Sequence, residues 1–67
     1  MFKLFIITEE GADYLGDFTT LAYCDRATEI KLDIMHKIDG IKKARFYALD
    51  DKGVKAVTWI LGVKEDW

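Results

Sequence analysis

Hydrophobic residues in the segment 2–8 occupy both alternating sets of positions, and the segment 54–63 shows the same pattern. Successive side chains of a strand point to opposite faces, so each segment has two apolar faces. Strands buried on both faces of a sheet have this pattern. One helix covers one face of such a sheet, and the second face must meet solvent, a second copy or a partner. In the first segment, Phe2, Leu4 and Ile6 form one set, and Phe5 and Ile7 form the other.

The segment 20–38 is predicted to be that helix. Its apolar residues recur every three or four positions, which places them on one face. Thr19 precedes them as an N-cap, because its hydroxyl can accept a bond from a free backbone N–H, and Gly40 is a typical C-terminal stop. Phe18 and Tyr23 have the spacing of a hydrophobic staple. The predicted core stripe is Tyr23, Ala27, Ile30, Ile34 and Ile38, widened by Cys24 and Met35.

The opposite face of this helix is charged, and Asp33 and Lys37 form a favourable pair on it, four residues apart. A second interpretation starts the helix at Asp25 and extends the preceding strand through Tyr23, because the threonines before them favour strands. Both starts stay open. The charged face comprises Asp25, Arg26, Glu29, Asp33, His36 and Lys37.

Turn residues separate four predicted strands. The turn 9–13 contains Gly11, which allows positive φ, and Gly16 is expected at a bulge or an edge position. The run 50–53, Asp-Asp-Lys-Gly, is a strong hairpin signal. The predicted fold is an α+β domain of order ββαββ, a four-stranded antiparallel sheet with one helix packed on one face. The strands are residues 2–8, 14–18, 41–49 and 54–63.

The register of the second hairpin assigns side chains to the two faces. If Leu49 lies opposite Val54, the small Ala44 lies opposite Trp59 and leaves room for the indole. The face under the helix is then Ala44, Phe46, Ala48, Val57, Trp59 and Leu61.

The face turned away from the helix is called the open face from here on. In the first strand, the charged Lys3 belongs to the same alternating set as Phe5 and Ile7, so this set is predicted to face outward. Phe2, Leu4 and Ile6 are therefore predicted to face the core. All 12 acidic residues lie outside the three long strands, so the open face is mixed aromatic and basic. The site residues predicted on it are Lys3, Phe5, Ile7, Lys43, Arg45, Tyr47 and Ile60.

Size, charge and cysteine usage limit the class of protein. A chain of 67 residues forms one domain. The net charge of −2 argues against a DNA-coating protein, which would be basic. Cys24 has no partner for an internal disulfide, which fits a reducing compartment. The apolar run 4–7 is too short for a signal peptide or a membrane span. We expect a cytoplasmic protein, in the host cytoplasm if a phage encodes it, that acts without a membrane.

No catalytic or metal-binding motif is evident in the sequence. We expect His36 to be a solvated surface residue, because no partner has suitable spacing, and Cys24 to be a small core residue. The acidic pairs 9–10 and 50–51 are interpreted as turns, since calcium loops need more oxygen ligands. We expect no enzyme activity, cofactor or metal. Trp67 is either an anchor for a partner or part of a frayed tail.

The run from Lys42 to Val54, KKARFYALDDKGV, is similar to the C-terminal hairpin of short T-even phage antitoxins, which neutralise host RNase toxins. The ββαββ layout also resembles that of small accessory proteins of tailed phages. The resemblance implies a cofactor-free domain that binds and blocks a host protein. It covers about a fifth of the chain, and no functional residue is carried over from it.

Two functions follow from these observations as expectations. The first is a protein-binding module, an inhibitor or regulator of a larger protein, which acts by occlusion or by adding to a sheet edge or face. A homodimer through the open face is compatible with it. The alternative is a single-stranded nucleic-acid-binding domain that uses Lys43, Arg45 and Tyr47 on the open face.

Overall fold

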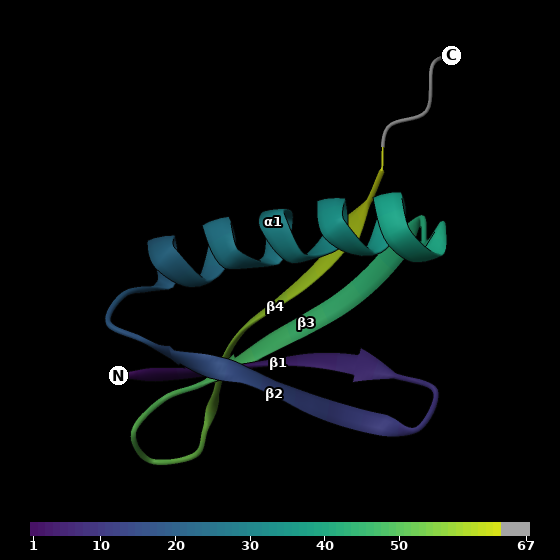
Figure 1. Ribbon diagram of the computed structural model, residues 1–67. Coiled ribbons are helices and arrows are strands. Elements are labelled where there is room, and N and C mark those ends of the chain that lie inside the picture. The colour runs from purple at the N-terminus through teal and green to yellow at the C-terminus, as the bar shows by residue number, and fades with distance from the viewer. Residues whose placement is uncertain (64–67) are drawn as a thin grey trace.

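The alternating apolar positions of the chain form a four-stranded antiparallel sheet, which one helix crosses on a single face (Figure 1). The computed structural model describes residues 1–63, and the strand order is β2-β1-β3-β4. The predicted ββαββ fold is confirmed. No helix within these residues combines the length and hydropathy that crossing a membrane requires. The elements are β1 (Phe2–Thr8), β2 (Gly11–Phe18), α1 (Leu21–Asp39), β3 (Lys43–Leu49) and β4 (Lys55–Gly62).

The core lies between α1 and the two central strands, β1 and β3. Leu4 is fully buried and Ile6 nearly so, while Ile7 is exposed. The inward placement of Leu4 and Ile6 is therefore confirmed. The buried apolar residues are Leu4, Ile6, Cys24, Leu32, Ala44, Phe46 and Ala48.

The register of the second hairpin differs from the predicted one by two residues. Phe46 lies opposite Trp59, and Ala44 lies opposite Leu61. The cause is the turn, where the Asp50 carboxylate accepts hydrogen bonds from the backbone N–H groups of residues 52 and 54, each at 2.9 Å. A register irregularity between Ala48 and Leu49 lies directly before this tight turn. A shift of two preserves the side-chain alternation, so the residues assigned to each face are unchanged.

The first hairpin has a tighter turn than predicted. Thr8 lies opposite Gly11, so β2 begins three residues before the predicted start at residue 14. The register shifts between Leu4 and Phe5, where β2 carries Gly16 at φ 138°. Because an L side chain rarely adopts such a φ, glycine suits this bulge. Gly16 therefore lies at a bulge on an edge strand, as expected.

The N-cap of the helix is Thr20, one residue later than the predicted cap, Thr19. Thr20 has an extended backbone, and its side chain accepts a hydrogen bond from the Tyr23 backbone N–H at 3.2 Å. The alternative start at Asp25 is therefore wrong. A hydrophobic staple joins the residue before the cap to the fourth residue after the cap, so with Thr20 as the cap Phe18 and Tyr23 no longer have that spacing. Gly40 ends the helix in the left-handed conformation, at φ 69°.

The stripe of α1 that packs on the sheet is not the predicted one. Cys24, Thr28 and Leu32 are buried, whereas four of the five stripe residues are exposed. The helix has two adjacent apolar stripes, roughly a third of a turn apart. The Thr28 hydroxyl suits a buried position because it donates a 2.6 Å hydrogen bond to the Asp25 carbonyl. The exposed residues of the predicted stripe are Tyr23, Ile30, Ile34 and Ile38.

One long-range hydrogen bond helps to fix the rotation of α1. The Trp59 indole N–H donates to Asp25 Oδ1 at 3.0 Å, which joins β4 to the first turns of the helix. The Trp59 ring is half-buried against the core, in agreement with its predicted place under the helix. With Asp25 held toward β4, the buried arc is centred on Cys24, Thr28 and Leu32.

The face assignment predicts different stability losses at two neighbouring isoleucines. Ile6 is 3% exposed and Ile7 is 43% exposed. Ile6→Ala should lower the free energy of unfolding by about 2–5 kcal/mol, because it leaves a cavity in the core. Ile7→Ala should lower it by about 1 kcal/mol or less. Urea denaturation followed by circular dichroism measures both, and equal losses would contradict the assignment.

Candidate functional site

The open face gathers all seven predicted site residues from β1, β3 and β4. Phe5 pairs with Tyr47 and Ile7 with Arg45 across β1 and β3. Arg45 in turn pairs with Ile60 of β4. Directly opposed residues of antiparallel strands share a face, so these side chains form one surface. Lys3 lies at the start of β1 and Lys43 at the start of β3, on the same face.

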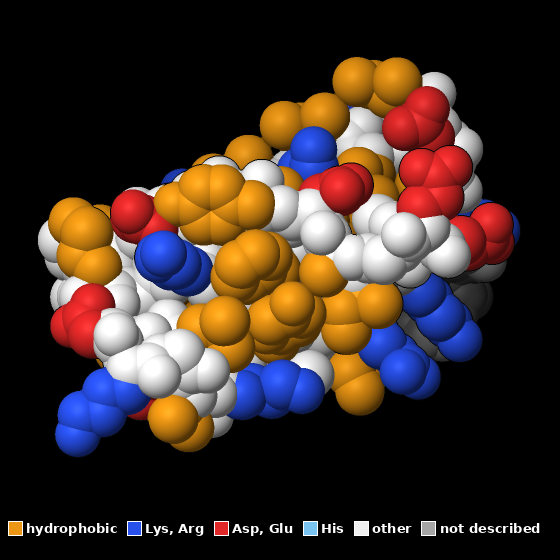
Figure 2. Space-filling view, turned by 90° about the horizontal axis from the view of Figure 1, so that it is seen from below, with side chains coloured by type: hydrophobic (Ala, Val, Ile, Leu, Met, Phe, Trp, Pro, Cys, Tyr) orange, Lys and Arg blue, Asp and Glu red, His pale blue; other side chains and the backbone are white. Residues whose placement is uncertain are grey.

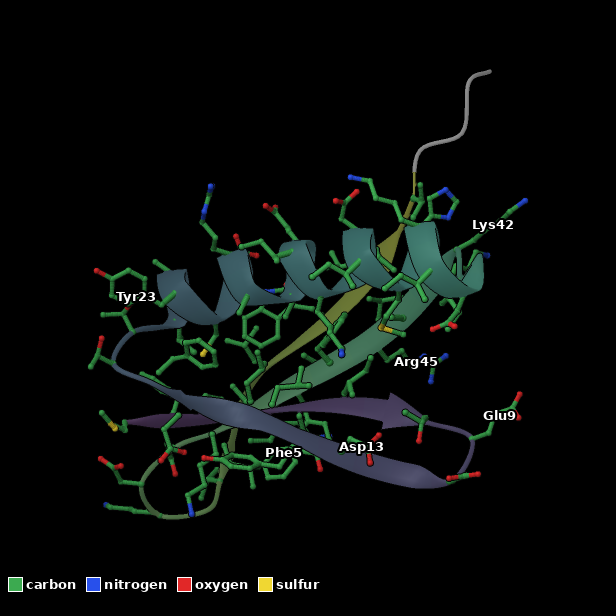
Figure 3. The ribbon with its side chains drawn as sticks, in the orientation of Figure 1. Phe5, Glu9, Asp13, Tyr23, Lys42 and Arg45 are labelled. Atoms are coloured by element: carbon green, nitrogen blue, oxygen red, sulfur yellow. The ribbon has the colours of Figure 1, made fainter. Side chains whose placement is uncertain are left out.

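An aromatic row crosses the middle of the open face. The Phe5 ring stacks on Tyr47, with centroids 5.1 Å apart and planes inclined by 14°. On its other side Phe5 contacts Tyr14 of β2, with centroids 5.5 Å apart and planes inclined by 49°. Lys55 Nζ lies 5.4 Å from the centroid of Tyr47. Phe5 lies on the side of β1 that faces away from α1 (Figure 3).

The faces of the Phe5 and Tyr47 rings are largely covered by other side chains of the same molecule. Phe5 and Tyr47 are neighbours on adjacent strands and stack nearly parallel, so each covers a face of the other. Lys55 lies against the Tyr47 ring in a cation–π contact. Rings that stack across strands stand up from the sheet, so they present mainly their edges to an approaching molecule.

The open face is more basic than the chain as a whole. On this face the strands carry four cations and one carboxylate, that of Asp17. At one end of this face, Asp50, Asp51 and Lys52 of the β3–β4 turn line a hollow together with Lys3 and Phe5. Asp17 accepts a hydrogen bond from the Tyr14 hydroxyl, and this bond is the main cause that raises the pKa of Tyr14. Figure 2 shows hydrophobic side chains at the centre of this view, Lys and Arg along its lower border and lower right, and Asp and Glu at its left and upper right. The four cations are Lys3, Lys43, Arg45 and Lys55.

Two members of this surface were missing from the sequence-based set. Tyr14 joins the row because the first hairpin turns tightly, which places it opposite Phe5. Gly11 indicated a turn in this segment, but the sequence Glu9-Glu10 is not one of the favoured two-residue loops, so it did not specify the length of the turn. Lys55 joins through its contact with Tyr47, and no local pattern indicated this contact.

The other candidate residues do not assemble a reactive centre. Within residues 1–63 no group of three or more His, Cys, Asp or Glu side chains is placed to hold a metal ion. His36 is half-buried rather than solvated, contrary to expectation. Asp50 uses its carboxylate in the β3–β4 turn. Trp67 lies outside the described residues.

Cys24 lies in the core, as expected. It is fully buried, and this burial raises the pKa of its thiol, while a backbone hydrogen bond opposes the rise. The thiolate is the nucleophilic form of cysteine, so a raised pKa disfavours reactivity near neutral pH.

Comparisons with protein-family models, with curated proteins and with solved structures gave no match to this chain. The resemblance of its second hairpin to phage antitoxins therefore stays a hypothesis.

The burial of Cys24 predicts slow alkylation of the folded protein. At pH 8, iodoacetamide should react at least about a hundredfold more slowly in buffer than in concentrated urea, because only opening of the helix exposes the thiol. Mass spectrometry of quenched samples gives both rates, with glutathione as the reference thiol. A rate in buffer equal to that of glutathione would show that Cys24 is accessible.

Proposed function

We propose that this chain is a protein-binding module that inhibits or regulates a larger protein by occluding part of its surface. The open face is the binding surface. The observation that carries this proposal is an apolar row, bordered by cations, that no helix or strand within residues 1–63 covers. The helix α1 lies on the opposite face of the sheet.

The side chains of the open face suit protein contact. Ile60 is 72% exposed and Ile7 is 43% exposed, and they lie on either side of Arg45. Each pairs with Arg45 from a neighbouring strand. Aromatic residues and arginine contribute most strongly to protein interfaces, and aliphatic side chains pack around them. This composition supports a buried centre with a charged border.

The charge of the open face indicates what kind of partner it binds. The strands carry four cations and one hydrogen-bonded carboxylate on this face, and the carboxylates of Asp50 and Asp51 adjoin only one end of it. The excess of cations on the strands favours a partner surface rich in Asp and Glu. Two copies placed open face to open face would bring like charges together, which opposes association. We therefore assign the open face to a different protein and not to a homodimer.

The alternative, single-stranded nucleic acid, has one observation in its favour: three aromatic rings and four cations share a face. Base stacking requires exposed ring faces. The Phe5 and Tyr47 faces are engaged with each other and with Tyr14 and Lys55. Nucleic acid is thus the second candidate.

The proposal includes a cytoplasmic site of action and no catalytic role. The resemblance to small phage proteins suggests a host protein as the target, with the host cytoplasm as its location. Occlusion requires only a stable surface, which fits a chain of this size.

Site-specific photo-crosslinking in the native host cell tests the proposed surface. A photoreactive amino acid replaces exposed Thr58, which pairs with Tyr47 on the open face. The same probe at exposed Glu29 of α1 is the matched control. The probe at Thr58 should give an adduct with another protein, identified by mass spectrometry, that the control does not give.

Charge reversal then tests the acidic partner. Adding Arg45→Glu to the Thr58 probe should reduce the adduct at least about tenfold, because it places like charges together. Identical adducts from both probe positions would contradict the assignment of the open face.

Fluorescence titration with a labelled oligothymidylate tests the alternative. We expect only weak binding at low salt, which disappears as salt is raised. Tyr47→Leu should leave it unchanged. A loss of about tenfold in affinity in this variant, with its circular dichroism spectrum retained, would instead establish base stacking on the open face.

A further inference from the structure

A second apolar surface lies on the flank of α1, separate from the open face. It consists of the exposed helix residues of the predicted stripe, with Ala27 between them, and is called the flank stripe here. The four large residues are between 45% and 75% exposed. Monomeric proteins rarely expose a contiguous apolar surface without a function for it. The flank stripe comprises Tyr23, Ala27, Ile30, Ile34 and Ile38.

An open groove runs beside the flank stripe. Leu15 and Phe18 of β2 form one wall, and Ala27, Ile30 and Ile34 of α1 form most of the other, around a volume of about 320 Å³. The flank stripe and this groove together offer an apolar surface with room for a large side chain. In Figure 3 Tyr23, at the start of the stripe, projects sideways past the N-terminal end of α1 and not into the space between helix and sheet.

The charges beside the flank stripe select one arrangement of two such helices. At 100° per residue, Arg26 and Asp33 lie on the same flank of the stripe, and Lys31 lies on the other. Residues on the same flank meet in an antiparallel helix pair, whereas residues on opposite flanks meet in a parallel pair. Antiparallel packing therefore brings Arg26 to Asp33, while parallel packing brings Arg26 to Lys31.

We propose that the flank stripe binds a second copy of this chain, with the two α1 helices antiparallel. Ala27 of each copy then packs against Ile30 of the other at the centre, and Tyr23 packs against Ile34 and Ile38. Arg26 of each copy forms an ion pair with Asp33 of the other, and Asp33 also keeps its own 3.0 Å contact with Lys37. The small Ala27 lies opposite the larger Ile30 at the centre of this seam, which suits close packing there.

This interface leaves both open faces uncovered. The open face lies on the side of the sheet away from α1 (Figures 1 and 3), and the flank stripe belongs to α1 itself. The homodimer therefore does not depend on the proposed function, and it would present two binding surfaces to a target.

A charge-swap experiment tests the antiparallel pairing. Arg26→Asp places a carboxylate against Asp33 of the second copy, and Asp33→Arg places a guanidinium against Arg26. Each variant alone should self-associate about tenfold more weakly than wild type at low ionic strength. Mixed together, the two variants regain both attractive pairs, so they should form a heterodimer with nearly wild-type affinity. Sedimentation velocity measures the affinities, and native mass spectrometry identifies the heterodimer.

Three outcomes would overturn the proposal. They are a wild-type chain that stays monomeric at every concentration, single variants that associate as strongly as wild type, and two weakened variants that fail to combine when mixed.

A pair of isoleucine variants tests which surface forms the dimer. Ile30→Asp should weaken self-association at least about a hundredfold, because it places a carboxylate in the apolar seam. Ile60→Asp on the open face is the matched control and should leave self-association unchanged. Both residues are more than half exposed, so both variants should retain the wild-type circular dichroism spectrum. If Ile60→Asp abolishes the dimer and Ile30→Asp does not, the flank stripe is not the interface.

Discussion

The structure depends on a mismatch between one helix and the sheet that it covers. The helix packs on one face of four strands, and its apolar arc is wider than the contact that it makes. Cys24, Thr28 and Leu32 fill the space over β1 and β3, and the neighbouring apolar stripe stays outside. A domain of this size has too few elements to cover every apolar surface. Two apolar surfaces therefore remain exposed, one on each side of the sheet.

These two surfaces differ in their chemistry, and the difference supports separate roles. The open face combines a row of rings with an excess of cations on its strands, which is why we propose an acidic protein and not a second copy as its partner. The flank stripe is mainly aliphatic, and the charges beside it, Arg26 and Asp33, are of opposite sign. It therefore suits self-association. A dimer formed in this way would hold two open faces, and binding at both would strengthen the occlusion of a target that offers two sites.

The sequence predicted best those features that do not change when the predicted strand register is wrong by two residues. Side chains alternate with a period of two, so the two-residue error in the β3–β4 register kept Phe46 and Trp59 on the core side. The position of Lys3 was sufficient to orient β1. The predicted candidate site was likewise unaffected by the register error, because all seven residues were assigned to the open face by their alternating positions in the strands. Tyr14 was missed since its position depends on the length of one turn.

The sequence by itself determined the ββαββ order and the inward face of each long strand, because turn residues and alternation are local properties. It also determined that no internal disulfide can form, since it contains one cysteine. Only the tertiary structure decided which of two apolar stripes on α1 is buried. Both have helical spacing, so the choice depends on contacts distant in sequence, including the bond between Trp59 and Asp25. The stacking of Phe5 on Tyr47 likewise depends on strand pairing, which local patterns do not specify.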